Sequence, residues 1–220
     1  MPSKFVTEYS PMILIGQYDS PFVRRVAIAM RRYGIGYEHR PWSVFGDAEK
    51  IAEHNPLLRV PTLVLDDGEL LIESSAILDA IDEMVGPERA LLPRSGPVRR
   101  DGMRVMALAT GFADKSVSLY LETLLRKAPS ETWIGRCRRQ IAETLDLLEA
   151  DRARRESRFW LGDAPGHPDI TVACALCHLR EAHPGFFDAD RWPTLAHHAA
   201  LCDTLEEFQA IYQPFVVTLG

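Results

Sequence analysis

Three short segments in the first third of the chain carry side chains that could bind a small anionic ligand: Ser20-Pro21-Phe22, Arg59-Val60-Pro61 and Glu73-Ser74-Ser75. Each adjoins an apolar run typical of a β-strand, so we expect each where a strand meets a turn or a helix. Backbone N–H groups at a helix start bind anions, and an open strand edge pairs with an extended peptide. The three segments therefore predict a pocket for a small, anionic, peptide-like ligand.

The hydroxyl of Ser20 is too weak an acid to serve as a base, but it can donate a hydrogen bond to a thiolate and favour the ionised form. A free thiol has a pKa of about 8.5, and lowering that pKa by ~2 units takes about 2.7 kcal/mol. One hydrogen bond to a charged group contributes ~1.5–3 kcal/mol, and the positive end of a helix beginning at Pro21 acts in the same direction. Tyr18 and Asp19 are nearby alternatives for this role.

The elements that must position these segments follow from local patterns. Strands are predicted at Met12–Gly16, Tyr37–Arg40, Pro61–Leu65 and Glu69–Ile72, and helices from Pro21 to Tyr33, around Ala48–Ile51 and after a cap at Ser74 or Ser75. Asp66-Asp67-Gly68 separates the last two strands and is a strong hairpin signal. The predicted order is β-α-β-α-β-β-α, with a right-handed parallel crossover followed by an antiparallel hairpin.

The rest of the chain has a helical pattern. A proline- and glycine-rich linker at 87–97 separates a first domain at 11–86 from a second at 98–212. Helices are predicted at Arg99–Lys127, Ser130–Glu156, Asp169–Glu181 and Thr194–Tyr212. The fold class is thus a small α/β domain followed by an all-α helical bundle.

Composition narrows the function. The 220 residues carry a net charge of −6, which disfavours nucleic acid as a partner. No run has the length of a signal peptide or a membrane span, so we expect a cytoplasmic protein whose four cysteines are thiols. Cys174-Ala-Leu-Cys177-His178 matches a c-type haem pattern, but it lies in an apolar helical run. We expect buried thiols there, no haem and no metal.

The segments SPFVRRVAIA, NPLLRVPTL and ESSAILDAI, followed by the helical half, resemble the cytosolic glutathione S-transferase family, in its serine type and similar to bacterial members. The resemblance extends from about Met12 to about Tyr212. It implies a thioredoxin-like N-terminal domain, reduced glutathione as co-substrate, a cytoplasmic homodimer, and a role in detoxification. The function it implies is conjugation of the glutathione thiolate to a hydrophobic electrophile.

The resemblance also implies residue roles. Ser20 is the catalytic residue, and Val60 precedes a cis proline and pairs with the cysteinyl part of glutathione. The expected glutathione-binding residues are Phe22, Arg59, Val60, Pro61, Glu73 and Ser74. The expected walls of the electrophile site are Trp42, Phe45, Phe112, Ser116, Tyr120 and also Leu119. Relatives commonly have glycine where this chain has Leu58. Whether the Arg59 side chain reaches the glycine carboxylate of glutathione therefore stays open.

Two other functions stay open. A glutathione-dependent cis–trans isomerase of the maleylacetoacetate type has a Ser-Ser-Cys run at the first helix, where this chain has Asp19-Ser20-Pro21. A binding or regulatory protein could keep the fold without catalysis. The absence of cysteine from the turn before Pro21 argues against a glutaredoxin-like activity.

Overall fold

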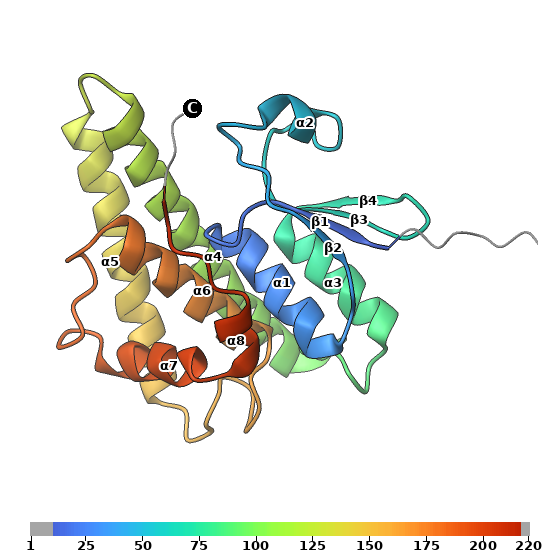
Figure 1. The fold of residues 1–220 in the computed structure, drawn as a ribbon. Helices are drawn as coiled ribbons and strands as arrows, with labels where there is room; N and C mark the ends of the chain where they lie inside the picture. The colour runs from blue at the N-terminus through green and yellow to red at the C-terminus, as the bar shows by residue number, and fades with distance from the viewer. Residues whose placement is uncertain (1–10, 217–220) are drawn as a thin grey trace, which may run out of the picture.

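The computed structural model describes residues 11–216. A four-stranded mixed sheet forms the first half of the chain, in the order β2-β1-β3-β4 (Figure 1). Its strands are β1 (Ile13–Ile15), β2 (Glu38–Arg40), β3 (Thr62–Val64) and β4 (Leu70–Ile72). β1 pairs in parallel with β2, whereas β3 runs antiparallel to both β1 and β4. The predicted crossover and hairpin are both confirmed.

Helices α1 (Pro21–Tyr33) and α3 (Ser74–Val85) lie along one side of the sheet, and the short α2 (Ala48–Ala52) stands beyond its other side (Figure 1). α1 begins as predicted, because Ser20 caps it and Pro21 occupies its first position. Gly34 ends it in the left-handed conformation, with φ of 70°.

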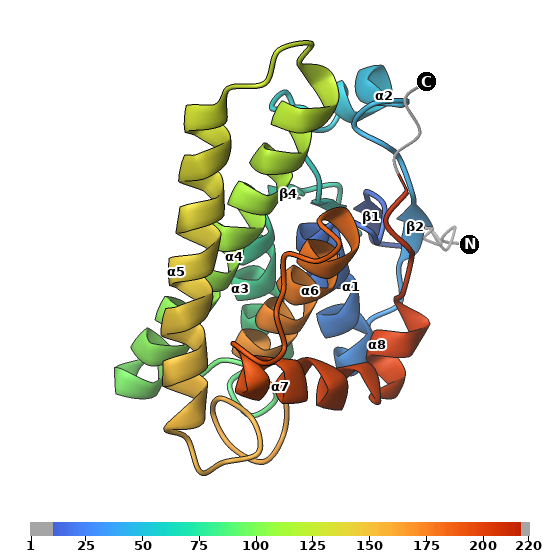
Figure 2. The ribbon, with the colours of Figure 1, turned by 90° about the vertical axis from the view of Figure 1, so that its left-hand side faces the viewer.

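The second half of the described chain is helical, with α4 and α5 forming a long antiparallel pair and α6 packed between α4 and α1 (Figure 2). The helices are α4 (Gly96–Leu125), α5 (Glu131–Ala153), α6 (His167–Ala182), α7 (Pro193–Asp203) and α8 (Glu206–Ala210). The prediction of one helix over Thr194–Tyr212 is wrong, because the extended backbone of Leu205 divides it into α7 and α8. α4 begins at Gly96, inside the segment predicted as linker.

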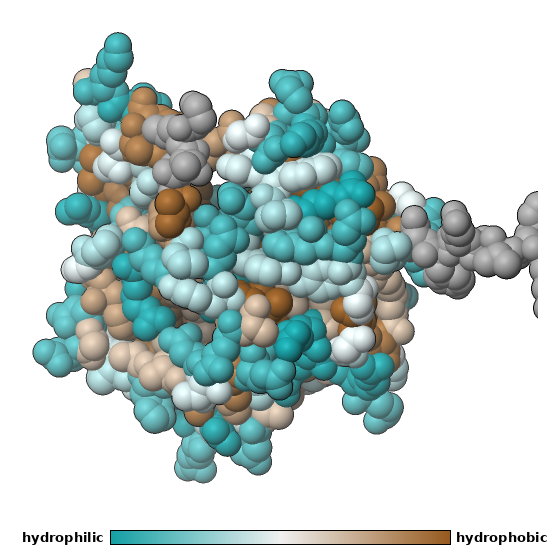
Figure 3. All heavy atoms as spheres, in the orientation of Figure 1, coloured by the Kyte–Doolittle hydropathy of each residue, from teal (hydrophilic) through white to brown (hydrophobic). Residues whose placement is uncertain are grey.

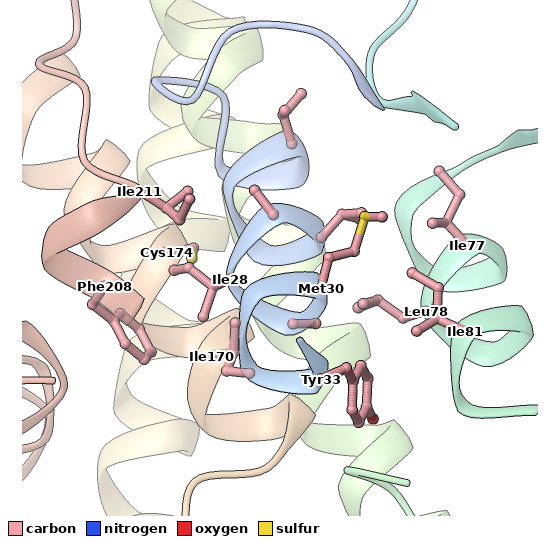
Figure 4. Close-up of a cluster of buried hydrophobic side chains, with 14 of the residues drawn as sticks. Ile28, Met30, Tyr33, Ile77, Leu78, Ile81, Ile170, Cys174, Phe208 and Ile211 are labelled. Atoms are coloured by element: carbon pink, nitrogen blue, oxygen red, sulfur yellow. The ribbon is translucent and has the colours of Figure 1, made fainter. Parts of the chain in front are cut away.

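α1 is the centre of the larger core and has protein on both sides. In Figure 4, Met30 points toward Ile77 and Leu78 of α3, while Ile28 points toward Cys174 of α6 and toward Phe208. The positions of α1, and with it Ser20, therefore depend on both halves of the chain.

Two buried arginines of α1 add polar contacts to this packing. Arg24 donates from Nη1 to Cys177 Sγ (2.7 Å) and from Nη2 to the Phe208 carbonyl (3.2 Å). Arg25 is 1% exposed and donates to Ser75 Oγ (2.8 Å) and Thr171 Oγ1 (3.3 Å). Since these partners lie on α3, α6 and α8, the two guanidinium groups connect the sheet half to the helical half.

The start of α6 is held by the buried carboxylate of Asp169. Gly166 N–H donates to Oδ2 and Trp160 N–H donates to Oδ1, both at 2.9 Å. A Cβ atom at Gly166 would lie 2.8 Å from the Leu91 carbonyl oxygen, which explains why glycine occupies the cap position. Burial raises the pKa of Asp169 to about 6, although both N–H groups oppose that rise.

Candidate active site

A cavity of about 460 Å³ lies between the start of α1, the loop before α2, the Arg59-Val60 turn, the middle of α4 and the last described residues. It is lined by Gln17, Asp19, Ser20, Pro21, Phe22, Trp42, Ser43, Val44, Phe45, Leu58, Arg59, Val60, Asp114, Val117, Ser118, Tyr120, Leu121, His178, Phe215 and Val216. The cavity thus joins elements from both halves, and most of its walls are apolar.

Ser20 lies at the wall of this cavity, at the positive end of α1. Its backbone is extended, with φ of −68° and ψ of 123°, and its Oγ accepts a long hydrogen bond of 3.4 Å from Val23 N–H. That bond leaves the hydroxyl hydrogen free to be donated to an anion in the cavity. The helix start and the hydroxyl therefore both favour negative charge at this place.

The Val60-Pro61 peptide bond is cis, as predicted. No backbone hydrogen bond of Val60 is found within residues 11–216, so its N–H and C=O are available to an extended ligand. Gly16, with φ of 126°, allows Val60 to approach, because a Cβ atom there would lie 2.8 Å from Val60 Cβ. The unpaired backbone of Val60 thus borders the helix start that carries Ser20.

Arg59 is the basic side chain at the opening of the cavity. Its guanidinium lies between two carboxylates, 3.7 Å from Glu73 Oε1 and 3.7 Å from Asp114 Oδ1. All three side chains are about half exposed, and at these distances the ion pairs contribute little to stability. The guanidinium can therefore turn toward an incoming carboxylate at little cost.

Glu73 and Ser74 lie beside the cavity but do not line it. Glu73 adopts φ of 65°, a conformation rare for a residue other than glycine, and it is the cap residue of α3. The prediction that Ser74 or Ser75 caps this helix is wrong. Ser74 is the buried first residue of α3, and Ser75 Oγ is engaged by Arg25. The turn presents the first N–H groups of α3 next to Glu73.

Two titratable groups of the cavity have strongly shifted pKa values. Burial raises the pKa of Asp19 to about 6, against the effect of the Ser20 N–H. Burial lowers the pKa of His178 to about 4, so its imidazole is neutral at pH 7. An ionised Asp19 next to Ser20 opposes a second negative charge in the cavity.

Only some of the residues predicted as walls of the electrophile site line the cavity. Trp42, Phe45 and Tyr120 line the cavity, whereas Phe112 and Ser116 are 1% and 0% exposed and Leu119 is also buried. These three residues belong to the stripe by which α4 packs on its neighbours. The α4 residues on the cavity side are Asp114, Val117, Ser118, Tyr120 and Leu121. Phe112, Ser116 and Leu119 therefore lie on the face of α4 next to the one that lines the cavity.

The last described residues, 212–216, form what we call the C-terminal strap. Glu181 accepts hydrogen bonds from Tyr212 Oη (3.0 Å) and from Phe215 N–H (2.7 Å). Gln213 Oε1 accepts a third from Tyr18 N–H at 3.0 Å. The Phe215 ring then stands edge-on to Tyr120, with ring centres 5.0 Å apart. The strap thereby closes one side of the cavity, and no feature of the sequence indicated it.

Hydrophobic residues continue beyond the cavity wall. Ser118 and Leu121 also line a second, shallower hollow with Leu125 and Trp133, and both of these side chains are exposed. Figure 3 shows hydrophobic residues gathered at the upper left of this face, over the ends of α4 and α5. Apolar surface therefore continues from the cavity along α4 to Leu125 and Trp133.

The other groups considered from the sequence lie elsewhere. Tyr18 is outside the cavity lining, and its hydroxyl shares a 2.7 Å hydrogen bond with that of Tyr37. Cys174 and Cys177 are buried within α6. Between residues 11 and 216 no cluster of three potential metal ligands is found, and no helix of that part is long and apolar enough to cross a bilayer.

Comparison with known proteins identifies the family. Residues 14–89 match the family model of the glutathione S-transferase N-terminal domain, and residues 131–200 match that of the C-terminal domain. The chain is 32% identical over 178 residues to an uncharacterised GST-like protein of Escherichia coli, YibF, covering 80% of this chain and 86% of the relative. It is 30% identical over 204 residues to the maleylacetoacetate isomerase of Pseudomonas aeruginosa, covering 86% and 90%. The chain belongs to the glutathione S-transferase family.

Solved structures agree with this assignment. A glutathione S-transferase of Methylobacterium radiotolerans, in complex with glutathione sulfonate, superposes with a TM-score of 0.87 at 26% identity, covering 96% of this chain and 98% of that one. A glutathione transferase family member of Pseudomonas fluorescens, with bound glutathione, gives 0.80 at 29% identity, covering 93% and 100%. The thioredoxin-like domain followed by a helical domain is thereby confirmed as the fold.

Proposed function

We propose that the protein is a glutathione transferase that binds reduced glutathione as a thiolate beside Ser20 and conjugates it to a hydrophobic electrophile. The observation that carries the proposal is the meeting of three features at one cavity: the start of α1 with a free hydroxyl hydrogen, the unpaired backbone of Val60 before a cis proline, and Arg59 at the opening. The glutathione bound in the related structures supports the choice of ligand.

In this proposal the tripeptide lies extended along the Arg59–Pro61 edge. The Val60 N–H and C=O pair with the cysteinyl residue like an added strand. The γ-glutamyl end meets the α3 start, where Ser74 and the first N–H groups bind the carboxylate and Glu73 attracts the ammonium group. Arg59 turns from its two carboxylate neighbours to the glycine carboxylate.

The sulfur then lies at the start of α1. The Ser20 hydroxyl donates to it, the α1 dipole stabilises its charge, and the pKa of the thiol falls. Phe22, with Trp42, Phe45 and Tyr120, offers an apolar surface for the electrophile. The thiolate attacks the electrophilic carbon while the cavity walls limit access of water.

The experiment is a calorimetric titration with reduced glutathione, followed by a pH titration of the bound thiol by ultraviolet absorbance. We expect binding and a bound-thiol pKa at least one unit below that of free glutathione. Absence of binding at millimolar ligand would remove the proposal.

An isomerase is the second candidate, because the Pseudomonas aeruginosa relative is a maleylacetoacetate isomerase. The two reactions differ in their use of glutathione, which conjugation consumes and isomerisation does not. Measuring free thiol before and after turnover therefore separates them. A protein that binds glutathione but turns over neither an aromatic halide nor a cis-enone would be the binding or regulatory protein.

We also propose that the protein is a cytoplasmic homodimer with a role in detoxification, as the family resemblance implies. Sedimentation equilibrium at micromolar concentration tests the dimer. A mass of one chain at all concentrations would contradict it.

A further inference from the structure

His178 is a buried polar side chain of the cavity that the proposed conjugation does not use. It belongs to α6, it is 4% exposed, and it lines the cavity together with Ser20 and Tyr120. Neither of its ring nitrogens has a hydrogen-bond partner among the described residues, and both are buried. The Asp19 backbone lies close enough to the ring to oppose the lowering of the His178 pKa, but the contact does not meet the distance and angle of a hydrogen bond.

An imidazole in this state is unfavourable for folding. Each buried polar atom without a partner carries the desolvation cost of that atom, so a residue placed for packing alone would gain from an apolar ring of the same shape. The histidine instead keeps one N–H donor and one acceptor at the wall of a ligand cavity. Its low pKa keeps the ring neutral at pH 7.

An aromatic ring already occupies the position next to this imidazole. Phe215 of the strap stands edge-on to His178, with ring centres 4.9 Å apart, and also edge-on to Tyr120, with ring centres 5.0 Å apart. Three hydrogen bonds hold the strap in place: two to Glu181, and one between Gln213 and Tyr18. Movement of one side chain, Phe215, would open both the aromatic position and the imidazole to a ligand.

We propose that His178 is a polar anchor of the electrophile site, which holds an uncharged oxygen of an electrophile whose aromatic body takes the position of Phe215. This inference rests on the proposed glutathione conjugation and adds a class of substrate to it. A charged carboxylate suits the position poorly, because Asp19 lines the same cavity. A ketone or hydroxyl oxygen matches the one donor and one acceptor of the neutral ring.

The test compares two conjugates that differ by one oxygen. The first is the glutathione adduct of 4-phenylbut-3-en-2-one, which carries a ketone, and the second is S-(1-phenylbutyl)glutathione, which has a methylene in its place. Their dissociation constants are measured by calorimetry for the wild type, His178→Phe and His178→Gln. One neutral hydrogen bond corresponds to about a fivefold change in affinity.

We expect the wild type to prefer the ketone adduct, and His178→Phe to reduce that preference about fivefold, while His178→Gln retains part of it. The melting temperature of His178→Phe should equal or exceed that of the wild type, because two buried unpartnered nitrogens are removed. A histidine with only a packing role would produce no change in the ratio of the two dissociation constants.

His198→Phe is the matched control, since His198 is also buried, also has a pKa lowered to about 4, and lies outside the cavity. It should keep the wild-type ratio. If His178→Phe also keeps that ratio, the anchor role is overturned and the glutathione site stands. If the wild type binds neither glutathione nor either adduct, the proposed function itself is overturned, and this inference with it.

Discussion

Replacing Ser20 by alanine separates its structural role from its chemical role. The first should change the free energy of unfolding only slightly, whereas the second should change the thiol pKa of bound glutathione strongly. The structural part is the cap of α1. The hydrogen bond from Val23 N–H to Ser20 Oγ is long, at 3.4 Å, so its loss should lower the free energy of unfolding by only about 0.5–1 kcal/mol, the weaker end for helix caps.

The chemical part is larger. A hydrogen bond to a thiolate contributes ~1.5–3 kcal/mol, and each pKa unit corresponds to about 1.36 kcal/mol, so the thiol pKa of bound glutathione should rise by ~1–2 units. If the wild-type protein holds that pKa near ~6.5, a rise of ~1.5 units lowers the thiolate fraction at pH 7 about eightfold. The conjugation rate should fall by a similar factor at pH 7 and approach the wild-type rate near pH 9.

The assay is the pH dependence of thiolate absorbance and of the single-turnover rate with an aromatic halide. Ser130→Ala is the matched control, because Ser130 caps α5 through an equivalent bond from Trp133 N–H of 3.3 Å and lies outside the cavity. It should cost the same stability and leave the thiol pKa unchanged. The reasoning is refuted if Ser20→Ala and Ser130→Ala give the same thiolate titration.

Three further predictions concern charge and capping. Asp19→Asn should lower the thiol pKa of bound glutathione. Burial raises the pKa of Asp19 from 3.8 to about 6 and destabilises only its ionised form. The variant should therefore melt at a higher temperature than the wild type above pH 6, and this difference should disappear by about pH 4. An equal difference in melting temperature at pH 4 and pH 7.5 would contradict the prediction. Arg59→Gln should weaken glutathione binding about tenfold but change the free energy of unfolding by under ~0.5 kcal/mol. In calorimetry, glutathione with an amidated glycine should bind the wild type and the variant equally. Asp169→Ala should lower the free energy of unfolding by about 3 kcal/mol in urea, because two buried N–H groups lose their acceptor; a loss below ~1 kcal/mol would show that water replaces the carboxylate.

Features that depend on local chemistry could be predicted from the sequence. The start of α1 follows from Ser20-Pro21, and the β3–β4 hairpin follows from Asp66-Asp67-Gly68, because caps and tight turns are determined by a few adjacent residues. The cis bond before Pro61 is different, since only the family resemblance predicted it.

Features that depend on packing could not be predicted in this way. Phe112, Ser116 and Leu119 were placed on the cavity side of α4, but that 30-residue helix presents different faces to α5, α6 and the cavity. The regular spacing of Val105, Ala109, Phe112, Ser116 and Leu119 is the buried stripe, and it could have identified the cavity face as the adjacent one.

Long-range contacts were missed for the same reason. The Arg24 side chain reaches Cys177 across 153 positions of sequence, and the strap reaches Tyr18 across 195. In the sequence, His178 belongs only to a haem-like pattern, which does not indicate its place in the cavity. Its low exposure and lack of partners become visible only in three dimensions.

The double-sided burial of α1 has a consequence for biosynthesis. The helix is translated before its contacts in α6 and α8, which follow it by about 150 and about 185 positions. Until then Ile28, Arg24 and Arg25 face solvent or other nascent chains, although they end as interior groups. The packing around α1 is therefore completed only after α6 and α8 have been translated, and premature termination before α6 should yield an aggregation-prone fragment rather than an independent small domain.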